Sequence, residues 1–69
     1  MKTAKFWRAQ YDDACRAIRE TMEQIKYNQY DGPEELDALD FELCELRAVR
    51  AEAWAKYRRA AAWAACGVN

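Results

Sequence analysis

The sequence predicts an all-α fold, an antiparallel two-helix hairpin, and three observations support this. The chain has only two Gly and one Pro, and the Pro follows the internal Gly at Gly32-Pro33. The stretches on either side are rich in Ala, Glu, Arg and Leu, which favour helices. Apolar residues recur along both stretches at spacings of three and four, as on the buried face of a helix. We therefore expect one helical-hairpin domain over residues 1–69.

The first helix is expected from about residue 3 to residue 29. This segment contains no Gly or Pro, and one face of it carries side chains suited to a partner helix. That face consists of Trp7, Tyr11, Ala14, Cys15, Ile18, Met22 and Ile25.

The turn is expected at residues 30–33. Gly32 either ends the first helix or caps the second, Pro33 suits a first helical position, and Glu34 and Glu35 favour the positive end of a helix dipole. Because this connection is short, the two helices should run antiparallel over about 40 Å.

The second helix is expected from about residue 34 to residue 66, and Gly67 marks its end. Its stripe facing the first helix consists of Leu36, Leu39, Leu43, Leu46, Ala53, Tyr57, Ala60 and Ala64.

A homodimer that forms a four-helix arrangement is expected, because so short a chain buries only about 60% of its unfolded surface. The second helix has a further series of small residues at Cys44, Ala48, Ala51, Ala55, Ala62 and Ala65. Small residues let helices approach closely, although Ala is also the best helix former on a solvated face. The predicted dimer interface consists of Ala51, Trp54, Ala55, Ala62 and Trp63.

The cysteines favour a reducing compartment. Cys15, Cys44 and Cys66 are odd in number and lack CxxC spacing, so we expect reduced thiols, the first two buried and Cys66 more exposed. No secretory signal or membrane span is expected, because charges interrupt every apolar run. The predicted location is the cytoplasm.

Charge is distributed unevenly along a chain whose net charge is only −1. From Asp31 to Glu45 there are seven acids and no base, whereas from Arg47 to Asn69 there are five bases and one acid. A hairpin would place Lys2, Lys5 and Arg8 beside the second group. We therefore expect an acidic turn end and a basic open end.

Two aromatic residues, Tyr27 and Phe41, fall nearly opposite the apolar stripes of their helices. Aromatic residues are enriched where proteins bind one another, and acids would complement a basic protein surface. An ordinary helix N-terminus already explains Asp31, Glu34 and Glu35. The predicted partner-binding residues are Tyr27, Asp37, Asp40, Phe41 and Glu45.

Enzymatic function is not expected, since the chain has no His and no Ser. Ser-His hydrolytic triads, His-ligated metals and Gly-rich phosphate loops all lack their residues. We expect neither a cofactor nor a metal site.

In length, in its turn QYDGPEELDALDFELCELR and in its second helix rich in Ala, Trp and Arg, the chain resembles the small quorum-sensing anti-activators of certain Pseudomonas phages. The resemblance implies an inhibitor that dimerises, binds the DNA-binding domain of a LuxR-type transcription activator and blocks its binding to promoters. It also implies a second target, the assembly ATPase of type IV pili.

Two alternatives stay open. The first is an RNA-binding dimer similar to the plasmid copy-number hairpin proteins, in which the basic end contacts phosphates. The second is a purely structural subunit. Because an acidic turn end repels phosphates, direct nucleic-acid binding is the weaker prediction.

Overall fold

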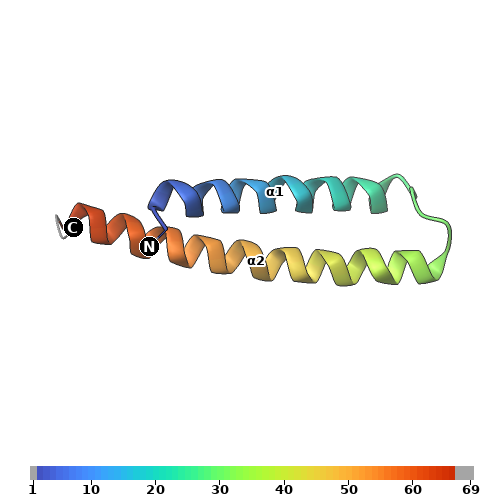
Figure 1. The fold of residues 1–69 in the computed structure, drawn as a ribbon. Coiled ribbons are helices and arrows are strands. Elements are labelled where there is room, and N and C mark those ends of the chain that lie inside the picture. Colours follow the sequence, from blue (N-terminus) through green and yellow to red (C-terminus); the bar gives the residue numbers. More distant parts are fainter. Residues whose placement is uncertain (1, 67–69) are drawn as a thin grey trace.

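The computed structural model describes residues 2–66, which form two antiparallel helices (Figure 1). Helix α1 spans Ala4–Lys26 and helix α2 spans Pro33–Ala65. The predicted all-α hairpin is confirmed, and Gly67, the predicted end of the second helix, lies outside the described residues.

Helix α1 begins where a side-chain cap is available. Thr3 is the N-cap residue, and its hydroxyl oxygen accepts a hydrogen bond of 3.3 Å from the backbone N–H of Phe6. This bond satisfies one of the N–H groups that the first turn leaves without a partner. The start of the helix agrees with the sequence prediction to within one residue.

The end of α1 was predicted three residues too late. Asn28 adopts a left-handed conformation, with φ of 55°, and this stops the helix at Lys26. The Asn28 N–H donates to the carbonyl of Ile25 at 3.1 Å, and the Gln29 N–H donates to that of Gln24 at 2.8 Å. These two bonds form a Schellman motif with Asn in the position that Gly usually takes. The Gln24 side-chain amide closes the turn by donating to the Gln29 carbonyl.

Helix α2 begins at Pro33, one residue before its predicted start, and Gly32 is its N-cap. Gly32 thus caps the second helix and does not end the first. It offers no side-chain cap, but the carboxylate of Glu35 accepts a hydrogen bond of 2.8 Å from the Asp31 N–H. With Glu34 also in the first turn, acids lie where the helix dipole favours them.

The molecule is 52 Å long and about 15 Å wide, longer than the predicted 40 Å. Helix α2 has 33 residues and α1 has 23, so α2 extends past the start of α1 (Figure 1). We call the end with both termini the open end and the other the turn end. Ala64, predicted to face α1, is exposed on this extension.

The core between the helices is thin. Its buried apolar residues are Ala14, Ile18, Leu39, Leu43 and Ala53, all from the predicted stripes. Thr21 is also buried, and its hydroxyl donates to the carbonyl of Ala17 at 2.9 Å. Met22 was predicted in the core but is 49% exposed, because it lies at the edge of the stripe where α2 does not cover it.

The cysteines are all free thiols, and one prediction about them is wrong. Cys15 is half-buried between the helices, and Cys66 is exposed as expected. Cys44, predicted to be buried, is exposed. It follows Leu43 by one residue, about 100° around the helix, and so turns away from α1.

Candidate functional site

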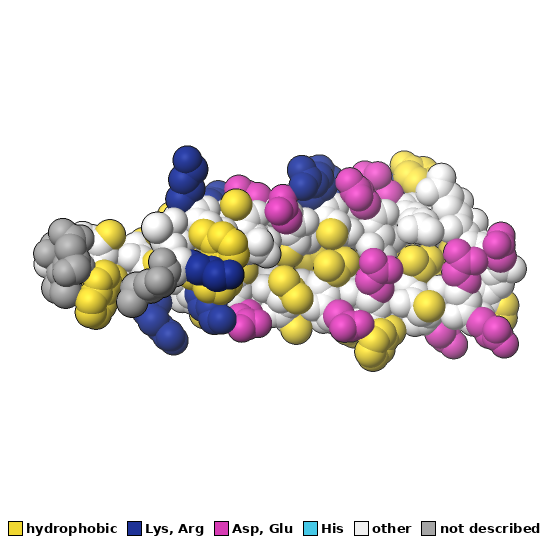
Figure 2. All heavy atoms as spheres, in the orientation of Figure 1, with side chains coloured by type: hydrophobic (Ala, Val, Ile, Leu, Met, Phe, Trp, Pro, Cys, Tyr) yellow, Lys and Arg dark blue, Asp and Glu magenta, His cyan; other side chains and the backbone are white. Residues whose placement is uncertain are grey.

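Charged side chains separate toward the two ends of the hairpin (Figure 2). Acids dominate the turn end, and Lys and Arg gather toward the open end. All seven acids between Asp31 and Glu45 are exposed. Within residues 2–66 the ion pairs are Arg8–Asp12, Arg16–Asp13 and Lys56–Glu52, so none of these seven acids is paired with a cation. Their charge is therefore available to a partner.

An exposed aromatic ring lies among the acids of α2. Leu39 and Leu43 face α1, and Phe41, two residues from each, points about 200° away and is 67% exposed. Asp37 and Glu45 lie one helical turn on either side of Phe41, and Asp40 precedes it. We call Asp37, Asp40, Phe41 and Glu45 the acidic patch. The structure brings these four predicted partner-binding residues together on one helix.

The fifth predicted partner-binding residue, Tyr27, lies apart from the acidic patch. It caps the C-terminus of α1 and is exposed, with the ammonium of Lys26 5.5 Å from its ring centroid. Tyr27 therefore belongs to a different helix from the acidic patch.

The open end is built from aromatic rings covered by cations. The Lys56 ammonium lies 4.6 Å from the Trp7 ring centroid, and the Lys2 ammonium lies 4.2 Å from that of Phe6. The Arg8 guanidinium lies between the rings of Tyr11 and Tyr57, at 5.6 and 5.7 Å. These distances are typical of cation–π contacts. Several cations at this end are thus held against the protein itself.

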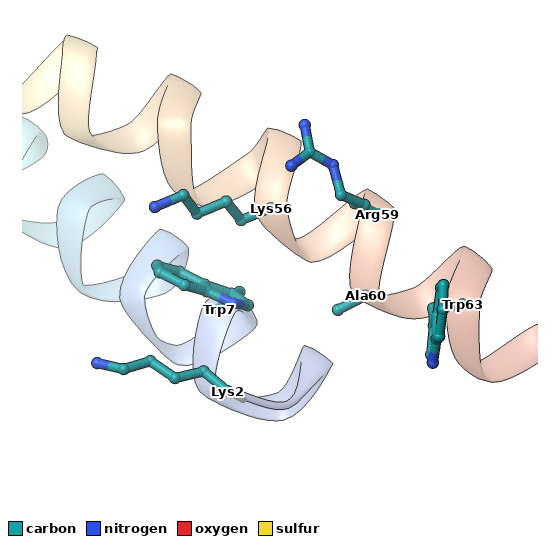
Figure 3. A pocket seen from close by; sticks show the side chains of 6 residues that line it. All are labelled: Lys2, Trp7, Lys56, Arg59, Ala60 and Trp63. Carbon is teal, nitrogen blue, oxygen red and sulfur yellow. The ribbon is translucent and has the colours of Figure 1, made fainter. Parts of the chain in front are cut away.

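A groove of about 360 Å³ opens at this end between the start of α1 and the extension of α2. In Figure 3, Lys56 and Lys2 lie on either side of the Trp7 indole, and Trp63 lies further along α2. No acid is among the described residues that line the groove, which are Lys2, Trp7, Lys56, Arg59, Ala60 and Trp63. Sequence reasoning did not find this groove, because it depends on the different lengths of the two helices.

The predicted dimer residues occupy more than one face of α2. Ala51, Ala55 and Ala62 are exposed at spacings of four and seven, on one outer face. The ring centroid of Trp54 lies 4.9 Å from that of Tyr11 and 5.4 Å from that of Tyr57, and the residue is 38% exposed. Trp63 lines the groove and is 52% exposed.

Tyr11, at the edge of this aromatic cluster, has a shifted pKa. A hydrogen bond with the Cys15 side chain, followed by electrostatic repulsion from that side chain and by desolvation, raises the pKa of Tyr11. The positive charges of Arg50 and Arg8 oppose this effect. Tyr11 thus stays a neutral phenol across the physiological range.

Two further features were sought in the described residues, a metal-binding cluster and a membrane-spanning helix. Within residues 2–66, no three His, Cys, Asp or Glu side chains lie close enough together to hold a metal ion. In the same range, neither helix has a stretch long and apolar enough to cross a membrane. Comparisons with protein-family models, curated proteins and solved structures found no match for this chain.

Proposed function

We propose that this protein is a non-enzymatic inhibitor that uses the acidic patch to occupy a basic surface of a regulatory protein. One observation carries the proposal: the ring of Phe41 is 67% exposed among acids that pair with no cation in the described residues. An aromatic anchor surrounded by charge is typical of a binding hot spot, since the ring buries area while the charges steer the partner.

The partner class follows from complementarity. The DNA-contacting face of a transcription factor is basic, and an acidic helix competes with DNA for such a face. The DNA-binding domain of a LuxR-type quorum-sensing activator is the specific candidate, supported by the resemblance to phage anti-activators. A type IV pilus assembly ATPase is a second candidate from the same resemblance.

RNA binding at the open end is less well supported. Lys56 is paired with Glu52 at 3.0 Å, and Lys2, Arg8 and Lys56 lie over aromatic rings. Phosphate contacts would have to displace these cations from existing partners. The two proposals predict different sensitive residues, the acidic patch in one case and Arg58 and Arg59 in the other.

The test is calorimetric titration of a purified LuxR-type DNA-binding domain with the wild-type protein and two variants. Asp37→Lys/Asp40→Lys and Phe41→Ala should each weaken binding at least tenfold, or about 1.4 kcal/mol. Glu20→Lys/Glu23→Lys, with the same change of charge on exposed positions of α1, is the control and should bind normally. Equal binding by all four proteins, or a loss only on reversing Arg58 and Arg59, would contradict the proposal.

A further inference from the structure

The groove at the open end has an exposed apolar surface. Helix α2 continues past the start of α1, and Figure 3 shows Ala60 on this stretch between the indoles of Trp7 and Trp63. Trp7 and Ala60 are half-buried, and Trp63 is 52% exposed. The volume of about 360 Å³ is near the lower end of the range of about 300–1,000 Å³ for binding pockets. The groove therefore has room for a few side chains, not for a folded domain.

Three cations surround this apolar surface, and no acid is among the described residues that line it. The Lys2 ammonium lies 4.2 Å from the ring centroid of Phe6 and 5.9 Å from that of Trp7, and the Lys56 ammonium lies 4.6 Å from that of Trp7. Arg59 is exposed and takes part in none of the ion pairs or cation–π contacts within residues 2–66. Its guanidinium can therefore bind a carboxylate through two parallel hydrogen bonds.

Lys56 can bind a second carboxylate without leaving its present partner. Its ammonium is paired with Glu52 at 3.0 Å, and an ammonium has three N–H groups to donate. Glu52 is not among the residues that line the groove. It therefore lowers the positive charge beside the groove but does not occupy it.

The arrangement around Trp7 disfavours a nucleic acid as the occupant. Single-stranded nucleic acids combine phosphate contacts with stacking of their bases on aromatic faces. In Figure 3 the Trp7 indole has Lys56 on one side and Lys2 on the other, so neither face is open to a base. Only Trp63 remains in the groove for stacking. A carboxylate needs no open ring face, because it binds the ammonium groups themselves.

We propose that the groove binds a short acidic segment of another protein, in which an apolar side chain lies between carboxylates. The apolar side chain packs on Ala60 between the two indoles, one carboxylate binds Arg59, and another binds Lys56. Charge complementarity favours this occupant, because the described lining is apolar and cationic. The inference does not rest on the proposed function, since the groove and the acidic patch have opposite charge and lie on different parts of the hairpin.

The test is an NMR titration of the isotopically labelled full chain with a capped synthetic peptide of sequence DDFDD. The indole N–H signals of Trp7 and Trp63 should shift and saturate, whereas that of Trp54, which is outside the groove lining, should stay in place. Arg59→Glu should weaken binding by about tenfold or more, because it replaces an attraction by a repulsion. Glu52→Gln should strengthen binding, because it frees Lys56 from its present ion pair.

Matched controls separate the groove from general charge effects. Arg58→Glu makes the same charge change at the next residue, which is exposed and outside the groove lining, and should weaken binding by less than about threefold. Asp37→Lys/Asp40→Lys should bind the peptide at least as well as wild type, although it removes the acidic patch. The peptides NNFNN and DDADD, which lack the carboxylates or the ring, should each bind more weakly than DDFDD.

Several results would overturn the proposal. These are no saturable shift of the Trp7 and Trp63 indoles at millimolar DDFDD, equal binding of NNFNN, or equal losses from Arg58→Glu and Arg59→Glu. Saturable shifts of the same indoles with oligothymidylate but not with the peptide would overturn it in favour of a single-stranded nucleic acid. Arg59 has no contact of the kinds above within residues 2–66, so its reversal should preserve the fold, and an unchanged Trp54 indole signal checks this.

Discussion

The turn half and the open half of this hairpin are built from different side chains. Toward the turn, Ile18, Leu39 and Leu43 are buried, and the seven acids from Asp31 to Glu45 have no ion-pair partner among the described residues. Toward the open end the buried residues are Ala14 and Ala53, flanked by aromatic rings that hold cations. In the turn half these acids are thus free to contact a partner, whereas Lys2, Arg8 and Lys56 in the open half already contact aromatic rings.

The largest loss of stability is expected from a substitution in the core of the turn half. Leu43→Ala should lower the free energy of unfolding by about 2–4 kcal/mol, because the truncated side chain leaves a cavity. In a chain this small, that is a large fraction of the total stability. Met22→Ala is the control, and it should cost less than about 1 kcal/mol because Met22 is half-exposed. Urea unfolding at one fixed protein concentration measures both, and equal losses would contradict the burial pattern.

The open half should lose stability when a larger side chain is placed in its core. Ala53 is 2% exposed beside the neighbouring rings, so Ala53→Leu should destabilise the protein by about 1–3 kcal/mol through overpacking. Ala9→Leu adds the same volume at an exposed position of α1 and should change little. Thermal unfolding followed by circular dichroism compares the two. A stable Ala53→Leu variant would show that the open half is loosely packed.

A smaller loss of stability is expected from substitutions at Asn28, where the turn begins. Asn28→Ala should cost about 1 kcal/mol, because Asn tolerates the left-handed conformation at φ of 55° better than Ala does. Asn28→Gly should be neutral or stabilising, since Gly adopts this conformation freely. Urea unfolding of both variants is the measurement. A loss of stability with Gly equal to that with Ala would contradict this account of the helix end.

The smallest effect is a pH dependence at the open half. Because the pKa of Tyr11 is raised in the folded state, its contribution to stability is present below pH 10 or so and is lost as pH rises through the folded pKa. Cys15→Ala should return the pKa of Tyr11 toward its ordinary value. An NMR titration of the Tyr11 ring measures this, and an unchanged pKa would exclude Cys15 as its cause.

The sequence was sufficient to predict the hairpin, because a lone Gly-Pro step and two apolar stripes admit few other arrangements. It predicted the start of α2 to within one residue and identified all five buried apolar residues in the described part of the chain. It missed the end of α1, because Asn28 is a weaker stop signal than Gly.

The candidate sites were predictable only in part. Asp37, Asp40, Phe41 and Glu45 share one helix, so spacing alone was enough to group them. The groove was missed because Lys2 and Trp7 approach Lys56 and Trp63 only after the helices pair with unequal lengths. Trp54 was assigned to the dimer interface, and periodicity did not show that its ring also contacts Tyr11.

The most direct test of the central claim asks which end of the hairpin binds a partner. Amide shifts of the isotopically labelled protein would be followed by NMR as a LuxR-type DNA-binding domain is added. The account predicts shifts concentrated at Asp37, Asp40 and Phe41, with the amides of Lys56 and Arg58 unchanged. Shifts concentrated at the open end, or no shifts with this domain, would contradict it.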